Sequence, residues 1–293
     1  MKVTLLSDVD PGSGPRSVAI GTFDGVHLGH REVIRGSDTV LTFDPHPLSV
    51  IRPEATPKLL NTFAVKRDLI AGLGVKEFVM IPFDRSFAAQ SAEEFVHEVL
   101  IAKLSAERVS VGENFRFGKG AKGTEELLRS HSEFDTHVTR LVEVEGETVS
   151  STQIRGLVAA GEVMEATAFL GSPFLFEGEV VHGDKRGREL GMPTANLVPD
   201  DRFVCPGHGV YAAWAGDHPA AVNVGVRPTF ATGRGLLVEA HLIGFEGDIY
   251  GETLRIAFLE KMRGERAFDS VDALVEQMNR DVEQAAEICS RVA

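Results

Sequence analysis

The sequence predicts an α/β domain built on a parallel sheet, followed by a small antiparallel β-barrel with a C-terminal helix. Up to about residue 171, short apolar runs alternate with segments of helical periodicity, as in parallel strands joined by helical crossovers. From residue 172 onward, strand-like runs are separated only by turns rich in Gly and Pro, a spacing typical of antiparallel barrels. We therefore expect two domains, residues 1–171 and 172–293.

Composition and charge indicate a globular protein and argue against nucleic-acid and membrane partners. The chain has 293 residues, of which 43% are hydrophobic and 25% charged, as in globular proteins. Its net charge of −13 argues against extended binding to nucleic acid or to an anionic membrane. Cys205 and Cys289 fit no metal or redox spacing, and no apolar run approaches the ~20 residues of a membrane span. We expect a cytoplasmic protein without nucleic-acid or membrane partners.

The first domain has a regular order of expected elements. A capping box, Ser91-Ala92-Glu93-Glu94, marks the start of one helix, and residues 63–73 have the spacing of another. Strands are expected at 18–20, 39–43, 78–81, 108–111 and 138–142. Ligands of open parallel sheets bind beyond the carboxyl ends of the strands, so the segments that follow these strands are candidate site segments.

The most informative of these segments is G-T-F-D-G-V-H-L-G-H, residues 21–30. A strand precedes it and a helix follows, so free backbone N–H groups and the helix dipole favour an anion there. His27 and His30 are three residues apart and share one face of the first helical turn, with Gly29 between them. This arrangement indicates a phosphate site, and the alternative is a tight turn with two surface histidines.

Three further segments offer candidate ligand groups. T-F-D-P-H-P at 42–47 is either a ligand loop or a rigid turn. In V-G-E-N-F-R-F-G at 111–118, Asn114 and Phe115 are suited to reading the edge and stacking on the face of a planar ring, unless the aromatics belong to the core. In V-S-S-T-Q-I-R at 149–155, Arg155 follows a helix start and suits a polyphosphate, unless this is only a capped helix.

In the second domain we expect a barrel and a final amphipathic helix. The helix begins near Ser270, and its stripe of Leu274, Met278, Val282 and Ala285 is interpreted as core packing. Strands are expected at 174–181, 209–215, 220–226, 237–243 and 253–258.

Two features of the barrel carry candidate chemistry. Thr194 and Asn196 lie two apart on one face of an extended segment, where a hydroxyl and an amide oxygen could hold Mg²⁺ beside ATP phosphates. The alternative for this pair is an ordinary turn. Glu239 stands in an apolar strand and is a candidate general base, or else an outward-facing strand residue. The basic loop that begins at His182 and contains Lys185 suits phosphates.

Seven strings in order carry a resemblance to a known family. They are G-T-F-D-G-V-H-L-G-H, T-F-D-P-H-P, V-G-E-N-F-R-F-G, V-S-S-T-Q-I-R, G-M-P-T-A-N, V-N-V-G-V-R-P-T-F and V-E-A-H-L. Together they span nearly the whole chain and resemble the prokaryotic bifunctional riboflavin kinase/FAD synthetase family. The histidine turn alone is similar to the HxGH signature of nucleotidyltransferases.

The resemblance implies a fold and two reactions. A Rossmann-like nucleotidyltransferase domain would transfer AMP from ATP to FMN, giving FAD and pyrophosphate, with His27 and His30 stabilising charge on the phosphate. A barrel domain would phosphorylate riboflavin to FMN with ATP and Mg²⁺, with Glu239 as base and with Thr194 and Asn196 positioning the metal and phosphates. The implied nucleotide and substrate contacts are Gly21, Phe23, Asp24, Gly29, Asn114, Phe115, Ser151, Thr152, Arg155, Gly183, Lys185 and Arg227.

Two other functions remain open at this point. One is an HxGH nucleotidyltransferase for a non-flavin phosphate acceptor, fused to an unrelated barrel; the G-M-P-T-A-N string argues against it. The other is a flavin-binding sensor without turnover, against which the intact His27, His30 and Glu239 argue. The sequence leaves the oligomeric state undetermined.

Overall fold

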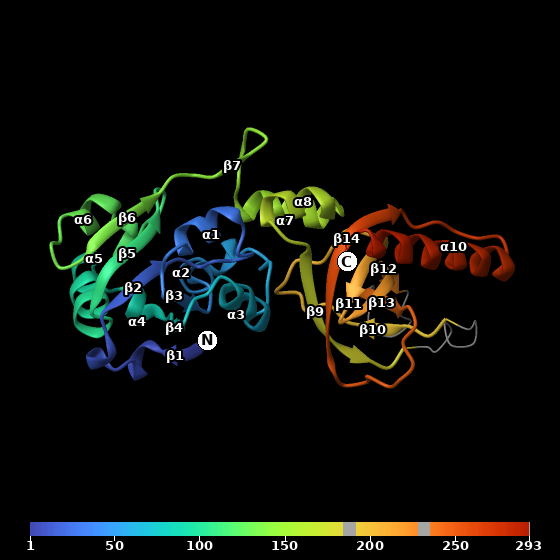
Figure 1. Cartoon of the computed structure of the whole chain (residues 1–293), viewed down its shortest axis with the longest axis horizontal. Helices are drawn as coiled ribbons and strands as arrows, with labels where there is room; N and C mark the ends of the chain where they lie inside the picture. Colours follow the sequence, from blue (N-terminus) through green and yellow to red (C-terminus); the bar gives the residue numbers. More distant parts are fainter. Residues whose placement is uncertain (184–191, 228–234, 293) are drawn as a thin grey trace. The chain divides into compact units, whose positions relative to one another are not determined.

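A computed structural model describes residues 1–183, 192–227 and 235–292, except the side chains of residues 226 and 227. The chain forms two compact units, each described here by itself (Figure 1). The first unit comprises Met1–Pro57 and Phe63–Ser150, and the second comprises Lys58–Thr62 and Ser151–Ala293. Among the described residues, no helix combines the length and apolar character needed to cross a membrane.

The first unit is built on a six-stranded sheet in which every neighbouring pair is parallel, as predicted. The expected strand at 138–142 instead occupies 135–139, because its partner strand ends at Gly112, which pairs with Thr139. The spatial order of the strands is β1 (Lys2–Leu5), β4 (Glu77–Pro82), β3 (Thr39–Asp44), β2 (Arg16–Ile20), β5 (Ala106–Gly112) and β6 (Asp135–Thr139).

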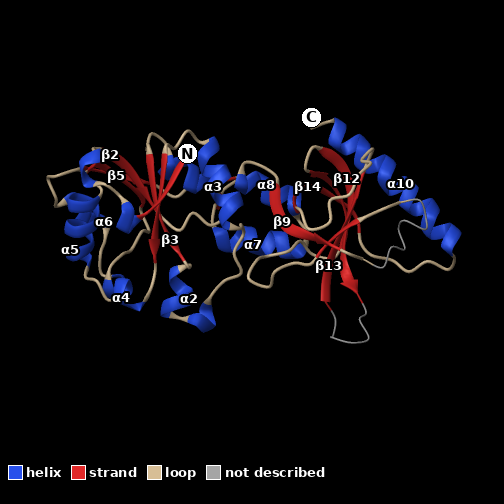
Figure 2. Ribbon diagram, turned by 90° about the horizontal axis from the view of Figure 1, so that it is seen from below, coloured by secondary structure: helices blue, strands red, loops and turns tan. Residues whose placement is uncertain are grey.

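Helices cover both faces of this sheet, which Figure 2 shows edge on. Side chains alternate along β2, so Val18 and Ile20 pack in one core and Ala19 packs in the other. α5 (Ala92–Glu94) and the π-helix η4 (Phe95–Lys103) contribute to the first core, and α1 (Leu28–Ile34) and α3 (Phe63–Gly72) to the second.

The remaining short elements are η1 (Leu6–Asp8), η2 (Pro11–Ser13), α2 (Pro47–Ile51), η3 (Pro53–Ala55), α4 (Arg85–Ala88), η5 (Lys119–Ala121), α6 (Glu125–Arg129), β7 (Glu143–Val144) and β8 (Glu147–Thr148).

The strand order places a topological switch point at β2. The chain runs from β2 to β3 and β4 on one side, and then returns to β5 on the other side of β2. Open α/β sheets bind ligands at such a point, beyond the carboxyl ends of the strands. The residues that directly follow Ile20 and Gly112 are therefore the ones that the topology directs toward a ligand.

The second unit is a closed barrel with helices at both ends of its sequence. α7 (Ser151–Ala160) and α8 (Val163–Leu170) precede the barrel, and α10 (Val271–Ser290) follows it. The start of α10 near Ser270 is as predicted, and Ser270 is its N-cap. The six strands pair antiparallel in the order β10 (Ala195–Leu197), β13 (Gly235–Leu242), β12 (His218–Arg227), β11 (Gly209–Ala215), β14 (Thr253–Arg263) and β9 (Phe174–Val181).

The final helix packs on the barrel with only part of its apolar stripe. Ala285 and Ile288 are buried against Ala212 of β11, as a core-packing interpretation requires. Leu274, Met278 and Val282 are half-buried and line a cavity instead. The prediction of core packing was therefore wrong for these three side chains, because this part of α10 faces the cavity rather than a closed barrel wall.

Candidate active sites

The turn after β2 is a buried and strained structure. Phe23 and Val26 both have positive φ, at 49° and 44°, values that β-branched and bulky residues rarely adopt. Both side chains are buried, at 1% and 0% exposed, and belong to the core beneath α1 and α3. Asp24 is only 1% exposed. Packing thus holds the turn in a conformation that its own backbone disfavours, as is common at functional sites.

The two histidines form one stacked pair at the start of α1. Their ring centroids are 3.5 Å apart and the rings are inclined by 15°. The Nδ1 atom of His27 accepts a hydrogen bond from the backbone N–H of His30 at 3.3 Å, so His27 is the N-cap of the helix. This bond assigns the ring proton of a neutral His27 to Nε2, where it can be donated to a ligand. Phe23 supports the pair through an edge-to-face contact with His30 at 5.4 Å.

Gly29 allows the imidazoles to stack. A Cβ atom at this position would lie 3.2 Å from Cε1 and 3.3 Å from Nδ1 of His27. Gly21 makes room for an aromatic ring in the same way, because a Cβ atom there would lie 3.0 Å from the Phe23 ring. The two glycines are therefore explained by the close approach of aromatic rings, and every expected residue of the turn is brought together.

A lysine that the sequence analysis missed joins this turn. Lys66 of α3 donates a hydrogen bond from Nζ to the backbone oxygen of Thr22 at 2.9 Å. Burial lowers the pKa of Lys66, and the negative charges of Asp24 and Asp44 partly oppose this effect. A half-buried lysine beside the histidine turn suits a polyphosphate ligand. No local pattern distinguishes Lys66 from an ordinary helix lysine, so only the fold reveals it.

The segment after β5 reaches the same region of the sheet. A Cβ on Gly112 would lie 3.4 Å from Oδ1 of Asn114 and 3.9 Å from Val33 of α1, so this loop approaches the helix that carries His30. Asn114 is exposed, whereas Phe115 is half-buried and stacks on Phe117 at 5.5 Å. Phe117 itself belongs to the core. A ligand contact by Asn114 or Phe115 stays a prediction.

The helix start at residues 151–155 forms as expected. α7 runs from Ser151 to Ala160, and Gly161 follows with φ of 86°. By its contacts this helix belongs to the second unit, whereas the histidine turn belongs to the first. Binding of ATP and FMN phosphates by Ser151, Thr152 and Arg155 therefore stays a prediction.

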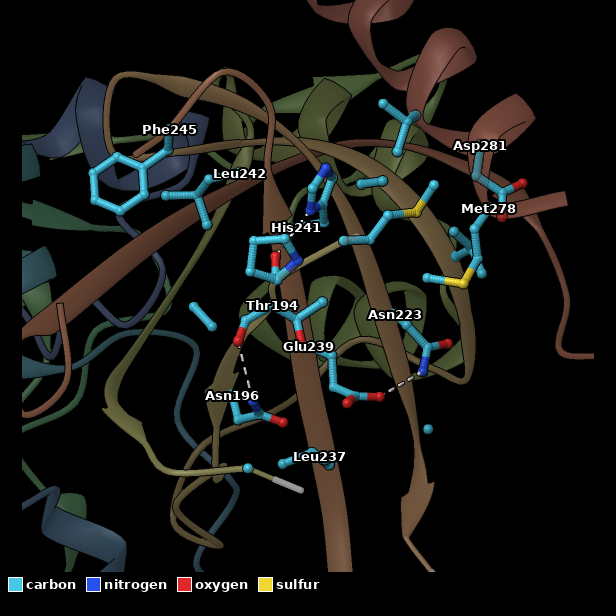
Figure 3. Close-up of a pocket in the computed structure, with 18 of the residues that line it drawn as sticks. Thr194, Asn196, Asn223, Leu237, Glu239, His241, Leu242, Phe245, Met278 and Asp281 are labelled. Atoms are coloured by element: carbon cyan, nitrogen blue, oxygen red, sulfur yellow. Dashed lines mark hydrogen bonds between the residues drawn. The ribbon is translucent and has the colours of Figure 1, made fainter. Parts of the chain in front are cut away.

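The second unit contains a cavity of about 820 Å³, a volume within the range of small-molecule sites (Figure 3). Glu239 of β13 lines it, and its strand neighbours are Asn196 of β10 on one side and Asn223 of β12 on the other. The amide of Asn223 donates to Oε2 of Glu239 at 3.4 Å. The alternative of an outward-facing Glu239 is thereby excluded.

Thr194 and Asn196 lie at the same cavity. Asn196 is 6% exposed, and its Nδ2 donates to the backbone oxygen of Thr194 at 3.2 Å, which leaves Oδ1 for another partner. Gly183 packs directly on this amide, since a Cβ there would overlap the side chain of Asn196. Lys185 lies outside the described residues, as does the side chain of Arg227, whose backbone is the last residue of β12.

The opposite wall comes from β14 and α10, which sequence reasoning assigned no functional part. Arg263 forms three hydrogen bonds to the carboxylate of Asp281, at 2.7 to 3.2 Å, and both residues line the cavity. Asp281 is 4% exposed, so this pair ties the helix to the barrel in a site sheltered from water. Met278, labelled in Figure 3, adds an apolar surface beside it. The sequence did contain an indication of this pair, because Asp281 is a charged residue beside Val282 in the apolar stripe of the final helix.

Comparisons with known proteins decide the family. The FAD synthetase family model matches residues 11–153, and the riboflavin kinase model matches residues 170–289. Similar relatives are the bifunctional riboflavin kinase/FMN adenylyltransferases of Escherichia coli K12 (37% identity, 90% of both chains), Listeria monocytogenes (35%, 90% of this chain and 89% of the other) and Bacillus subtilis (33%, 92% and 90%).

This chain belongs to the bifunctional riboflavin kinase/FMN adenylyltransferase family.

A solved structure has a similar architecture over nearly the whole chain. It is described as a macrolide-efflux protein from Streptococcus pneumoniae, is 32% identical, and covers 98% of this chain and 99% of its own with a TM-score of 0.86. The histidine turn lies in the segment matched by the FAD synthetase model, and Glu239 lies in the segment matched by the riboflavin kinase model. The two candidate sites thus lie one in each of the two segments that the family models match.

Proposed function

We propose that this enzyme converts riboflavin to FAD in two ATP-dependent steps, with one site in each module. The barrel phosphorylates riboflavin to FMN, and the histidine turn transfers AMP from a second ATP to FMN. The observation that carries the assignment is the row Asn196–Glu239–Asn223 across three neighbouring strands, facing a cavity large enough for a flavin. Residues 11–153 and 170–289 match one family model for each reaction.

In the kinase step, the carboxylate of Glu239 accepts the proton of the ribityl 5′-hydroxyl as that oxygen attacks the terminal phosphorus of ATP, the bond from this phosphorus to the bridging oxygen breaks, and ADP leaves. The amide of Asn223 donates to the same carboxylate and holds it in one orientation. Orientation matters because phosphoryl transfer depends on alignment of the attacking and leaving oxygens more than on covalent chemistry. The apolar side of α10, including Met278, shelters the flavin ring from water.

The donor set beside Glu239 fits Mg²⁺. Thr194 and Asn196 offer a hydroxyl and an amide oxygen, which are hard ligands of the kind this ion prefers. When bound, the ion would neutralise charge on the ATP phosphates. The hydrogen bond from Asn196 to the Thr194 backbone orients the amide so that its oxygen, rather than its nitrogen, is left for a cation.

In the adenylyl step, His27 donates from Nε2 to the α-phosphate of ATP while the FMN phosphate attacks that phosphorus and pyrophosphate leaves. His30 stacks on His27, so the two imidazoles act on one phosphate. Lys66 supplies positive charge beside the turn. Preorganised donors of this kind stabilise charge that develops in the transition state.

One incubation series tests both steps. The protein is supplied with riboflavin, ATP and Mg²⁺, and FMN and FAD are separated by chromatography; a second series starts from FMN. We expect FMN and FAD in the first series and FAD with pyrophosphate in the second. Activity on a non-flavin phosphate acceptor, with none on FMN, would favour the alternative nucleotidyltransferase. Tight flavin binding without either product would identify a sensor.

A further inference from the structure

A cluster of two histidines and two glutamates lies on the first unit, on the helix layer opposite to α1. Glu93 belongs to α5 and His97 to η4, while His131 and Glu133 lie in the loop between α6 and β6. α5–η4 and the loop are anchored in the core on the far side of the sheet from the one that holds α1, through Phe95, Leu128 and Phe134. The cluster is therefore separate from the histidine turn.

The potential ligand atoms of this cluster converge. One ligand atom from each of Glu93, His97 and His131 lies within 4.8 Å of the other two. Oε2 of Glu93 is 3.4 Å from Nε2 of His131, and the rings of His97 and His131 meet edge to face at 5.1 Å. Two imidazoles and a carboxylate are the donor types that Zn²⁺ binds in proteins.

We propose that Glu93, His97 and His131 form a binding site for Zn²⁺ or a divalent transition ion of similar chemistry, with water completing the coordination. Zn²⁺ bonds to nitrogen and oxygen of about 2.0–2.2 Å place neighbouring ligands of a tetrahedron roughly 3.3–3.6 Å apart. The Glu93–His131 pair already has this separation. His97 and Glu93 are exposed, so small side-chain rotations suffice to bring the third ligand in.

The state of the His131 ring distinguishes this site from an ordinary surface ion pair. Its Nε2 atom is buried, yet it makes no hydrogen bond within the part of the chain that the structure describes. Buried polar atoms normally have a hydrogen-bond partner, and an exception calls for an explanation such as an ion. Oε2 of Glu93 lies only 3.4 Å from Nε2 without forming a hydrogen bond to it, and an ion shared by the two atoms would explain this approach.

The other nitrogen of His131 faces a second carboxylate. Oε2 of Glu133 lies 3.8 Å from Nδ1 of His131. Metal-binding histidines commonly donate their other N–H to a carboxylate, which orients the ring and strengthens the ligand nitrogen. Glu133 is therefore a positioning residue in this proposal rather than a ligand.

The scaffold leaves these side chains available and holds them in place. Glu94, rather than Glu93, forms the capping box with Ser91, so the Glu93 carboxylate is free of that task. Helix geometry changes to the π form at Phe95, two residues before His97, and π-helical turns are frequent at functional sites. The His131 ring stacks on buried Phe134 at 6.1 Å. A bound ion would join α5–η4 to the loop after α6.

Metal titration of the untagged, nucleotide-free protein tests the proposal. Zn²⁺ binding is measured by calorimetry, and Co²⁺ is used as a spectroscopic probe of the coordination geometry. His131→Gln and His97→Ala remove ligands, and Glu133→Gln alters only the positioning residue. His137→Ala, at an exposed position of β6, and His27→Ala, in the histidine turn, are controls that leave the cluster intact.

We expect one Zn²⁺ per chain, a visible Co²⁺ spectrum of tetrahedral type, and a Zn²⁺-dependent rise in the melting temperature of the first unit. His131→Gln and His97→Ala should abolish these signals, and Glu133→Gln should weaken binding by about tenfold. Both control variants should bind as the parent protein does. An absence of saturable binding, equal binding by the ligand variants, or loss of binding in His27→Ala would overturn the proposal. Excess Mg²⁺ that displaces the Co²⁺ spectrum would also contradict it.

Discussion

Glu239 and Asn196 are directly paired across the antiparallel strands β13 and β10, and both side chains face the same cavity. Asn223 completes the row on the other neighbouring strand. This register places a carboxylate between two amides, so that one amide orients it and the other lies beside the expected phosphate position. The proposed role of Glu239 as the base of the kinase step depends on this pairing, because a slip of one residue would turn Glu239 away from the cavity.

We expect Glu239→Gln to lower riboflavin phosphorylation by about 10²–10⁴-fold, the usual contribution of a general base. The amide can still accept the hydrogen bond from Asn223, so folding should be unaffected. Adenylylation of FMN should continue at the parent rate, because it takes place in the other module. The two steps are assayed separately from riboflavin and from FMN. Glu252→Gln, at an exposed turn, is the control, and parental riboflavin phosphorylation by Glu239→Gln would exclude Glu239 as the base.

His27 caps α1, and we propose that it also binds the α-phosphate of ATP; the variant His27→Asn separates these two roles. The Asn side chain can retain the cap, which is typically worth about 1 kcal/mol, but it removes the Nε2–H donor. We expect FMN adenylylation to fall by about 10²–10³-fold with little change in the melting temperature. Riboflavin phosphorylation should be unchanged. A variant that loses stability but keeps its adenylylation rate when folded would show that His27 is only a cap.

Gly29→Ala tests whether the stacked rings must approach so closely. The added Cβ would lie 3.2 Å from His27, so the ring must move by a few tenths of an ångström. Because misplacement of about 1 Å can cost about 10²-fold, we expect FMN adenylylation to fall by roughly tenfold. Gly72→Ala in α3 is the matched control, since a Cβ there meets nothing within 4 Å. Equal adenylylation rates for the two variants would refute the explanation.

Met278→Ala tests the apolar wall that α10 contributes. The side chain is half-buried at the cavity, so its removal should weaken flavin contacts more than it destabilises the fold. We expect the KM for riboflavin to rise by roughly 10-fold or more, corresponding to about 1–3 kcal/mol of apolar contact. Val271→Ala, at an exposed position of the same helix, should leave KM unchanged. An unchanged KM in Met278→Ala would place the flavin elsewhere.

Alkaline pH should destabilise the fold through Cys205. Burial raises the pKa of this thiol to about 12 from an ordinary value of 9.0. Between these values the unfolded chain releases a proton that the folded chain keeps. The stabilising contribution is therefore complete below about pH 8 and is lost as the pH rises from 9 toward 12, by up to about 1.4 kcal/mol per pH unit. Burial also raises the pKa of Tyr211, which acts in the same direction.

Urea denaturation at pH 8 and pH 10.5 measures this effect. The free energy of unfolding should fall between the two values, and Cys205→Ser should show a smaller fall because the serine hydroxyl does not titrate in this range. An identical pH dependence for the parent and Cys205→Ser would show that this thiol is not the cause.

Much of the fold follows from local patterns in the sequence. The bounds expected for β9 and β11 match the structure, as do the capping box at Ser91 and the helix start near Ser270. These features depend on interactions between residues close in the chain, namely side-chain alternation and backbone hydrogen bonds at helix ends. The histidine turn could likewise be predicted from the sequence, because its glycines and histidines all lie within ten consecutive residues.

The tertiary structure decided which side chains come together, a question that local sequence patterns leave open. The direction of Glu239 is settled by its pairing with β10 and β12, and the approach of Lys66 to Thr22 by the packing of α3 near the end of β2. The convergence of His131 with Glu93 and His97 needs the loop after α6 to lie beside α5–η4. The sequence by itself determined most of the larger helices and strands and the residue types they carry, because those depend on short-range forces, whereas β1 and the exact position of β6 were not expected from it. Strand register and helix packing join residues distant in the chain, so they alone determine which of those side chains share a site.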